Sequence, residues 1–264
     1  MTLALVLGAA AALSLAMWGA WASERLTGKS GWIDSIWSAA TGLVAIMALA
    51  LLDTGEAWRR WAAMALVALW CLRLAGHIAA RNFTVGDDPR YKALREEWGS
   101  SAAWRLAWFL QVQAAAGLVL VVSVLAAASN PAPFPHWLDV VAIAVALAAL
   151  AGETLADAQL SGFRSRPKPK PPVMEEGLWA FSRHPNYFFE WMFWTAWPLL
   201  ALAGGTISAQ SLLAFAAPVQ MYVLLVHVSG IPPLEKHMLA SRGQAFRDLQ
   251  ARVNAFFPGP RKTG

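Results

Sequence analysis

The sequence has few charged residues: Asp, Glu, Lys and Arg make up 14% of it, whereas hydrophobic residues make up 58%. A typical soluble domain is about 25% charged, so this chain has too little polar surface to cover a water-soluble globule. Its one cysteine, Cys71, excludes an intramolecular disulfide and a thiolate metal cluster. The composition therefore predicts a membrane protein without disulfides.

Common nucleotide and metal motifs are also missing. No G-x-G-x-x-G follows a strand-like segment, which excludes a Rossmann domain, and no H-E-x-x-H occurs among the five scattered histidines. The stretch Gly28-Lys29-Ser30 resembles the end of a phosphate-binding loop, but Ser23 occupies the position of the required upstream glycine. We therefore expect no metal site.

Long apolar runs dominate the chain. A helix needs about 20 residues to cross the hydrocarbon core, and its backbone groups are all satisfied internally there. We therefore expect an all-α polytopic membrane protein with seven transmembrane helices, forming a single membrane domain over residues 1–264. The seven runs cover residues 3–21, 34–52, 57–76, 105–127, 137–157, 185–203 and 207–229.

Lysine and arginine gather in the connections after runs one, three and five (residues 22–33, 77–104 and 158–184) and in the tail after run seven. The positive-inside rule makes this side cytoplasmic, so the N-terminus is expected outside and the C-terminus in the cytoplasm. Arg59 and Arg60, after run two, are the exception. We interpret the net charge of +5 as a topology signal, with membrane lipid and not nucleic acid as the partner.

Two pairs of polar residues lie four positions apart in apolar runs, so each pair shares a helix face. Asn186 and Glu190 begin the sixth run, and Glu153 and Asp157 end the fifth. A carboxylate at membrane depth needs a partner or a polar cavity. The ribose and amide groups of a nucleotide are suitable donors. The alternatives are a shallow interfacial position for Glu190 and pairing with nearby arginines for the other two acids.

Basic residues flank these acids. Arg183 and His184 precede Pro185, which suits the first turn of a helix, and the free N–H groups of that turn favour a phosphate. The alternative is an interfacial cap anchored by Arg183 and Tyr187. The Pro-rich stretch 166–172 is expected to be extended, as a basic strap over an anionic ligand or as a simple connector.

A polar stripe also ends the third run, where Arg73, His77 and Arg81 follow one another at four-residue intervals. Asp34 begins the second run. It is expected either to cap the N-terminus of that helix or to serve as a protonated acid in a dry pocket.

At this point the motifs resemble a known family, the bacterial branch of the steroid 5-alpha-reductases. The resemblance extends from about residue 30 to residue 258. The R-H-P-x-Y core alone is less specific, because isoprenylcysteine methyltransferases and sterol reductases share it. The stretches that carry the resemblance are Gly177-Leu-Trp179, Arg183-His-Pro-Asn-Tyr187 with Glu190, Asp34-Ser-Ile-Trp37, Arg73-Leu-Ala-Gly-His77, Asp88-Pro-Arg-Tyr91 and Ser229-Gly-Ile-Pro-Pro-Leu-Glu235.

The resemblance implies a seven-helix monomer that holds NADPH in a cytoplasm-facing cavity and transfers hydride to the double bond of a steroid-like 3-oxo-4-ene substrate. Residues 1–104 would form the substrate side and residues 105–264 the nucleotide side. Matched to the family pattern, the cofactor-binding residues are Asp157, Arg164, Asn186 and Glu190, with Arg81 and Asn82 after the third helix. Further candidate cofactor contacts are Lys170, Arg183, His184, Tyr187, Glu235 and His237.

The candidates for polarising the substrate carbonyl are Asp34 and, second, His77. The eukaryotic enzymes use an acid in the second helix and a tyrosine in the third, and here the third run contains no tyrosine; Tyr91 lies beyond it. Selectivity for a steroid therefore stays open. Two other functions fit parts of the sequence. One is an S-adenosylmethionine-dependent methyltransferase, suggested by R-H-P-N-Y and the segment Glu235–Phe246. The other is a non-catalytic lipid-binding membrane protein.

Overall fold

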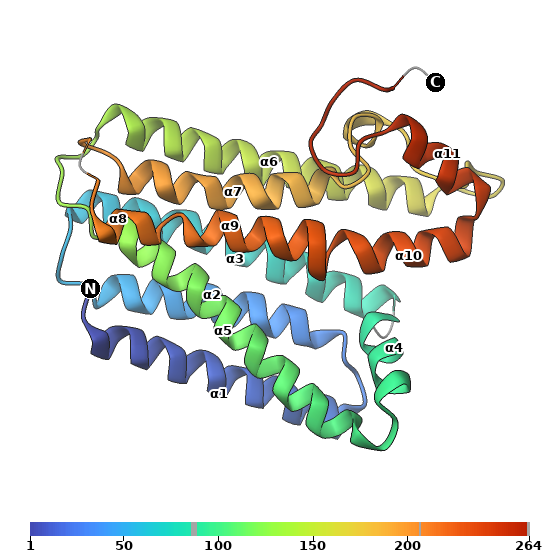
Figure 1. The fold of residues 1–264 in the computed structure, drawn as a ribbon, viewed down its shortest axis with the longest axis horizontal. Coiled ribbons are helices and arrows are strands. Elements are labelled where there is room, and N and C mark those ends of the chain that lie inside the picture. Colours follow the sequence, from blue (N-terminus) through green and yellow to red (C-terminus); the bar gives the residue numbers. More distant parts are fainter. Residues whose placement is uncertain (86–88, 206, 263–264) are drawn as a thin grey trace. The chain divides into compact units, whose positions relative to one another are not determined.

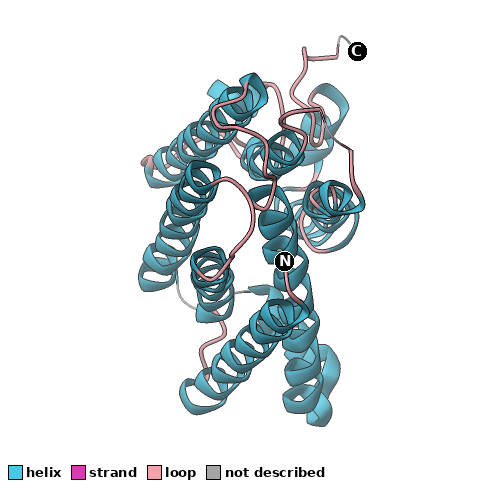
Figure 2. Ribbon diagram, turned by 90° about the vertical axis from the view of Figure 1, so that its left-hand side faces the viewer, coloured by secondary structure: helices cyan, strands magenta, loops and turns pink. Residues whose placement is uncertain are grey.

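The computed structural model describes residues 1–85, 89–205 and 207–262, and Figures 1 and 2 show that this part of the chain consists of helices and loops without strands. Asp88, which contributed to the family resemblance, lies outside the described residues. The expected all-α architecture is confirmed for the described part. The chain forms two compact units along its length: unit 1 comprises residues 1–143 and 197–217, and unit 2 comprises residues 144–196 and 218–264.

Six helices of the described chain are long and apolar enough to cross a membrane, which supports a multi-pass membrane protein. The sixth apolar run of the sequence forms α7 (Pro185–Ala201), a helix of 17 residues that is not among these six. The count of seven spans and the side on which each terminus lies stay predictions. The six candidate spans are Leu3–Thr27, Trp32–Ala50, Ala57–Phe83, Arg90–Ala128, Trp137–Ser165 and Ala209–Arg242.

Unit 1 is built mainly from α1, α2, α3 and α5, and its most extensive contacts join α2 to α3, α1 to α5 and α1 to α2. Gly42 allows the close approach of α2 and α3, because a Cβ at this position would lie 2.4 Å from the Cβ of Cys71. The helices of this unit are α1 (Leu3–Thr27), α2 (Trp32–Ala50), α3 (Ala57–Val85), α4 (Pro89–Trp98), α5 (Ala102–Ala128) and the short α8 (Ala209–Leu213).

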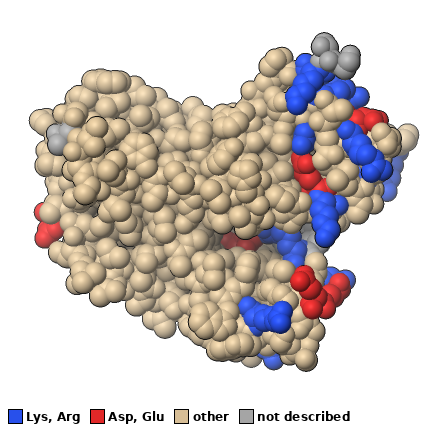
Figure 3. Space-filling model, viewed as in Figure 1, with Lys and Arg blue, Asp and Glu red and all other residues tan. Residues whose placement is uncertain are grey.

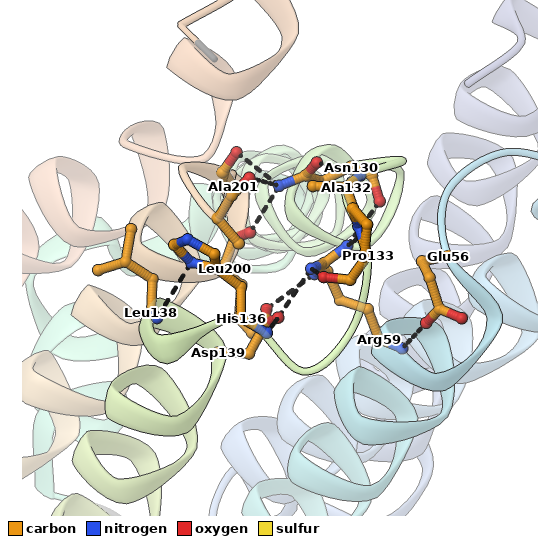
Figure 4. Close-up of polar contacts among 11 residues, drawn as sticks. Glu56, Arg59, Asn130, Ala132, Pro133, His136, Leu138, Asp139, Leu200 and Ala201 are labelled. Atoms are coloured by element: carbon orange, nitrogen blue, oxygen red, sulfur yellow. Dashed lines mark hydrogen bonds and ion pairs between the residues drawn. The ribbon is translucent and has the colours of Figure 1, made fainter. Parts of the chain in front are cut away.

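A buried ion pair holds the end of unit 1 where α3 begins (Figure 4). Arg59 and Asp139 have side chains that are 0% exposed, and Arg59 donates through Nε to Oδ1 at 2.8 Å and through Nη2 to Oδ2 at 2.7 Å. Arg59 Nη1 also donates to the carbonyls of Asn130 and Ala132 at 2.8 Å each. Arg59, an exception in the charge pattern of the loops, is therefore a structural residue and not a topology signal.

Unit 2 contains the C-terminal part of α6 (Trp137–Ser165), most of α7, a π-helical turn (Val223–Val228), α10 (Ile231–Arg242) and α11 (Gln244–Arg252). The helix α9 (Ala216–Tyr222) begins in unit 1 and ends in unit 2. The apolar face of α11 is covered because Phe246 and Leu249 pack with Val173 and Val253. Gly152 of α6 faces the ring of Phe189 of α7, where an added Cβ would lie 2.5 Å from ring carbons.

The charged residues of unit 2 are concentrated at one end. Figure 3 shows Lys and Arg side chains over α11 and the C-terminal segment. At this end, Arg252 and Arg261 both form ion pairs with Glu175, at 2.9 and 3.3 Å. The basic tail expected from the sequence thus forms a folded, charged end of unit 2.

Candidate functional site

The candidate site residues fall into both units. Four of them belong to unit 1, namely Asp34, His77, Arg81 and Asn82. The remainder belong to unit 2: Asp157, Arg164, Lys170, Arg183, His184, Asn186, Tyr187, Glu190, Glu235 and His237.

Asp34 is the centre of a polar cluster in unit 1. The N-cap of α2 is Gly31, so the alternative that Asp34 caps this helix is wrong. Its carboxylate instead accepts a hydrogen bond from the Tyr91 hydroxyl at 2.7 Å and forms an ion pair with Arg90. Asp34 is 22% exposed, whereas Tyr91 is only 4% exposed. The structure thus brings the only tyrosine of unit 1 to the predicted acid.

A second polar side chain supports this pair. Gln113 of α5 donates through Nε2 to the Tyr91 hydroxyl oxygen at 3.0 Å. The backbone carbonyl of Gln113 accepts a hydrogen bond from Trp37 Nε1 of α2 at 2.8 Å, which fixes α5 against α2 at this level. The cluster therefore joins α2, α4 and α5 within unit 1.

The polar end of α3 lies near the start of α2. Asn82 donates through Nδ2 to the carbonyl of Gly31, and Ser35 donates to the carbonyl of Ala75 at 3.0 Å. On the same helix, Arg81 is half-buried and His77 is exposed. Asn82 thus has a structural role in joining two helices, and the cofactor-binding roles of Arg81 and Asn82 stay predictions.

In unit 2 the two expected polar pairs meet. Asn186 of α7 donates through Nδ2 to Asp157 Oδ1 of α6 at 3.2 Å, and both residues are half-buried. One turn further along α7, Glu190 is 5% exposed and accepts a hydrogen bond from Trp194 Nε1 at 2.9 Å. The Asp157 carboxylate and the oxygen of the Asn186 amide can accept hydrogen bonds from hydroxyl and amide groups of a ligand.

The R-H-P-N-Y motif forms a buried cluster with the C-terminal helices. Glu235 of α10 accepts hydrogen bonds from Arg183 Nε at 2.7 Å and from Gln250 of α11 at 2.7 Å, and His184 Nε2 lies 2.9 Å from the same carboxylate. The ring of Tyr187 stacks on His184 at 5.6 Å between centroids. Arg183, His184 and Glu235, predicted to bind cofactor, therefore also bind one another.

Burial decides the charge of the histidine in this cluster. His184 is 3% exposed, and this burial lowers its pKa below the ordinary 6.5, although the neighbouring Glu235 opposes the shift. A neutral imidazole is thus favoured. The motif attaches the N-terminus of α7 to α10 and α11.

The Pro-rich strap folds back on α6. Lys170 donates through Nζ to the carbonyls of Phe163 and Arg164 at 3.3 and 2.5 Å, which satisfies carbonyl groups at the C-terminus of the helix. Arg166 pairs with Glu176 at 2.6 Å, and the hydrogen bond from Arg166 lowers the pKa of Glu176. Arg164 and His237 are exposed. Arg164 thus lies exposed in the last turn of α6, while Lys170 of the strap is engaged with the carbonyls of that helix.

Gln113 and Gln250 were not among the predicted site residues. Gln113 lies in the apolar run 105–127, and a polar residue inside such a run is a signal of a buried contact. Gln250 lies on a polar surface helix, where the sequence gives no comparable signal.

The comparisons with known proteins give one match. A family model described as "Protein of unknown function (DUF1295)" matches residues 20–253. No curated protein and no solved structure matches the chain.

Proposed function

The chain belongs to the DUF1295 family, whose model matches most of its length, and we propose that it is an NADPH-dependent reductase of apolar enones. This family is linked to steroid 5-alpha-reductase-like membrane proteins. The observation that carries the proposal is the hydrogen bond between Tyr91 and Asp34, because reduction of an enone requires a donor for the carbonyl oxygen. The substrate class includes 3-oxo-4-ene steroids.

In the proposal, Asp34 orients the Tyr91 hydroxyl before the substrate binds, and Tyr91 then donates its hydrogen bond to the substrate carbonyl instead of to Asp34. The sequence suggested Asp34 itself as the protonated acid. In the structure both carboxyl oxygens of Asp34 act as acceptors, since they accept hydrogen bonds from Arg90 and Tyr91. Tyr91 carries the O–H group of the pair, so we assign the donor role to Tyr91. His77 remains the second candidate.

The nucleotide is proposed to bind residues of unit 2. Asp157 and Asn186 are half-buried and lie 3.2 Å apart; their carboxylate and amide groups fit the hydroxyls of a ribose and a carboxamide. The exposed guanidinium of Arg164 at the end of α6 fits a phosphate. Lys170 could bind a phosphate only after it released the α6 carbonyls to which it now donates. When bound, NADPH supplies the hydride.

The reaction on the substrate is a conjugate addition followed by protonation. A C–H bond forms at the β carbon, and the π electrons move onto the carbonyl oxygen, where the hydrogen bond from Tyr91 stabilises the resulting enolate. Water then gives a proton to the α carbon, and the carbonyl is restored as the second C–H bond forms. One hydride and one proton are consumed for each double bond.

The remaining parts of the proposal concern placement in the membrane. We propose seven spans, with α7 as the additional span, an outer N-terminus and a cytoplasmic C-terminus in a bacterial inner membrane. The basic connections and tail of the sequence support this orientation. The apolar substrate would reach the protein from the lipid phase, and the protein would act as a monomer.

The direct test is turnover by the purified, detergent-solubilised chain with NADPH and progesterone or testosterone. We expect loss of NADPH absorbance together with formation of the saturated ketone by mass spectrometry. If the chain instead methylates a lipidated thiol from S-adenosylmethionine, or gives no product with either set of reagents, the reductase assignment is wrong.

A further inference from the structure

The contacts around Tyr91 determine the direction of its hydroxyl hydrogen. A phenol has one proton to donate, and a carboxylate can only accept. Because Asp34 is paired with Arg90 and lies 2.7 Å from the Tyr91 oxygen, the Tyr91 proton is donated to Asp34. Toward Gln113 the phenol oxygen can then only accept, so the amide of Gln113 presents its N–H group, at 3.0 Å.

Gln113 is an unusual residue for its position. Its Oε1 atom is buried and has no hydrogen-bond partner in the described part of the chain. A buried acceptor without a partner costs free energy, and an apolar side chain of similar size would avoid that cost. The hydrogen bond to Tyr91 is the interaction for which the amide is needed.

We propose that Gln113 is a positioning residue that sets the orientation and the donor strength of the Tyr91 hydroxyl. This inference rests on the proposed reductase function. A hydrogen bond donated to the phenol oxygen stabilises negative charge on that oxygen and so makes its O–H a better donor. When the substrate carbonyl replaces Asp34 as the acceptor of the Tyr91 O–H, the hydrogen bond from Gln113 keeps the Tyr91 oxygen in position.

The kinetic test is a double-mutant cycle with Gln113→Met and Tyr91→Phe. Methionine keeps the approximate volume of glutamine and removes the donor. We expect Gln113→Met to lower kcat about tenfold with little change in KM for the enone, the size expected for one supporting hydrogen bond. In the Tyr91→Phe background the same change is expected to have no further effect, because its target is absent. Equal losses in both backgrounds would overturn the proposal.

Gln111 provides the matched control. It lies two positions away on α5 and accepts a hydrogen bond from Ser14 of α1 at 2.7 Å, outside the Tyr91 cluster. Gln111→Met is expected to leave kcat unchanged. If Gln113→Met does not fold, Gln113→Asn repeats the test, since its amide is one methylene too short to reach Tyr91.

A second measurement does not depend on turnover. The chain has three tyrosines, so 3-fluorotyrosine labelling gives a ¹⁹F spectrum with three signals, assigned by Tyr→Phe variants. Gln113→Met should move the Tyr91 signal, whereas Gln111→Met should not. An unmoved Tyr91 signal would overturn the positioning role. A shifted signal in a chain that reduces no enone would refute the reductase function and leave the placement of Tyr91 by Gln113 intact.

Discussion

The Tyr91 hydroxyl donates a 2.7 Å hydrogen bond to the Asp34 carboxylate across a separation of 57 residues. Asp34 lies in the first turn of α2 and Tyr91 near the start of α4. The pair gives unit 1 an oriented O–H donor of the kind that can stabilise a developing oxyanion.

Removing this donor is expected to abolish most of the reductase activity. Tyr91→Phe should lower kcat by about 100-fold or more, as loss of an oxyanion donor does, and should leave the dissociation constant of NADPH unchanged. Steady-state kinetics combined with NADPH titration separates the two effects. Tyr222→Phe, a tyrosine of unit 2, is the control. Near-normal turnover in Tyr91→Phe would remove Tyr91 from the mechanism.

The Asp157–Asn186 pair is expected to contribute to nucleotide binding. Asn186→Ala removes the amide and should weaken NADPH binding about tenfold, which corresponds to one hydrogen bond. Isothermal titration of the detergent-solubilised protein measures the change. Gln244→Ala, a change at an exposed residue of α11, is the control, and equal affinity in both variants would exclude Asn186 from the nucleotide site.

The Arg59–Asp139 pair is expected to be the most sensitive point of unit 1. Arg59→Met leaves the buried Asp139 carboxylate without its cationic partner and the carbonyls of Asn130 and Ala132 without their arginine donor, a change that costs about 3–5 kcal/mol. The apparent Tm should fall by on the order of 10 °C. Arg60→Met, at the neighbouring residue, which is half-buried, should cause a much smaller change. Matching Tm values in a thermal scan of the two variants would mean that the buried pair contributes little.

The protein is expected to become less stable in mild acid because of His184. Burial lowers the folded-state pKa of this histidine below 6.5, so the unfolded chain binds more protons at low pH. The stabilising contribution is complete above pH 6.5 and is lost as the pH falls toward the lower, folded-state pKa. Unfolding followed between pH 5 and 8 should show this slope, and His184→Gln should flatten it. An unchanged slope in His184→Gln would assign the acid sensitivity to other groups.

The sequence predicted the helical membrane architecture better than it predicted the polar contacts. Hydrophobic run length depends on local composition, and five of the seven runs match candidate spans closely, beginning with residues 3–21 within Leu3–Thr27. In the last run, regular α-helix is interrupted at residues 214–215, between α8 and α9, and again by the π-helical turn at Val223–Val228, details that hydropathy does not contain.

The polar contacts depend on side chains far apart in the sequence. The four-residue spacing of Asn186 and Glu190 correctly indicated a shared face, and the structure adds the contact with Asp157. The contact between Tyr91 and Asp34 could not be predicted from the sequence, because Tyr91 lies beyond the third apolar run and reaches Asp34 only through the packing of α4. Arg59 was interpreted as a loop charge because its partner, Asp139, is 80 residues away.

The central claim is that the chain binds NADPH, and thermal unfolding of the purified protein with NADPH, NADH, S-adenosylmethionine or no ligand tests it most directly. A ligand at 100 times its dissociation constant adds about 2.7 kcal/mol of stability. We predict a clear upward shift of Tm with NADPH that is reduced in Arg164→Ala. A shift with S-adenosylmethionine alone, or no shift with any of the three ligands, would contradict the account.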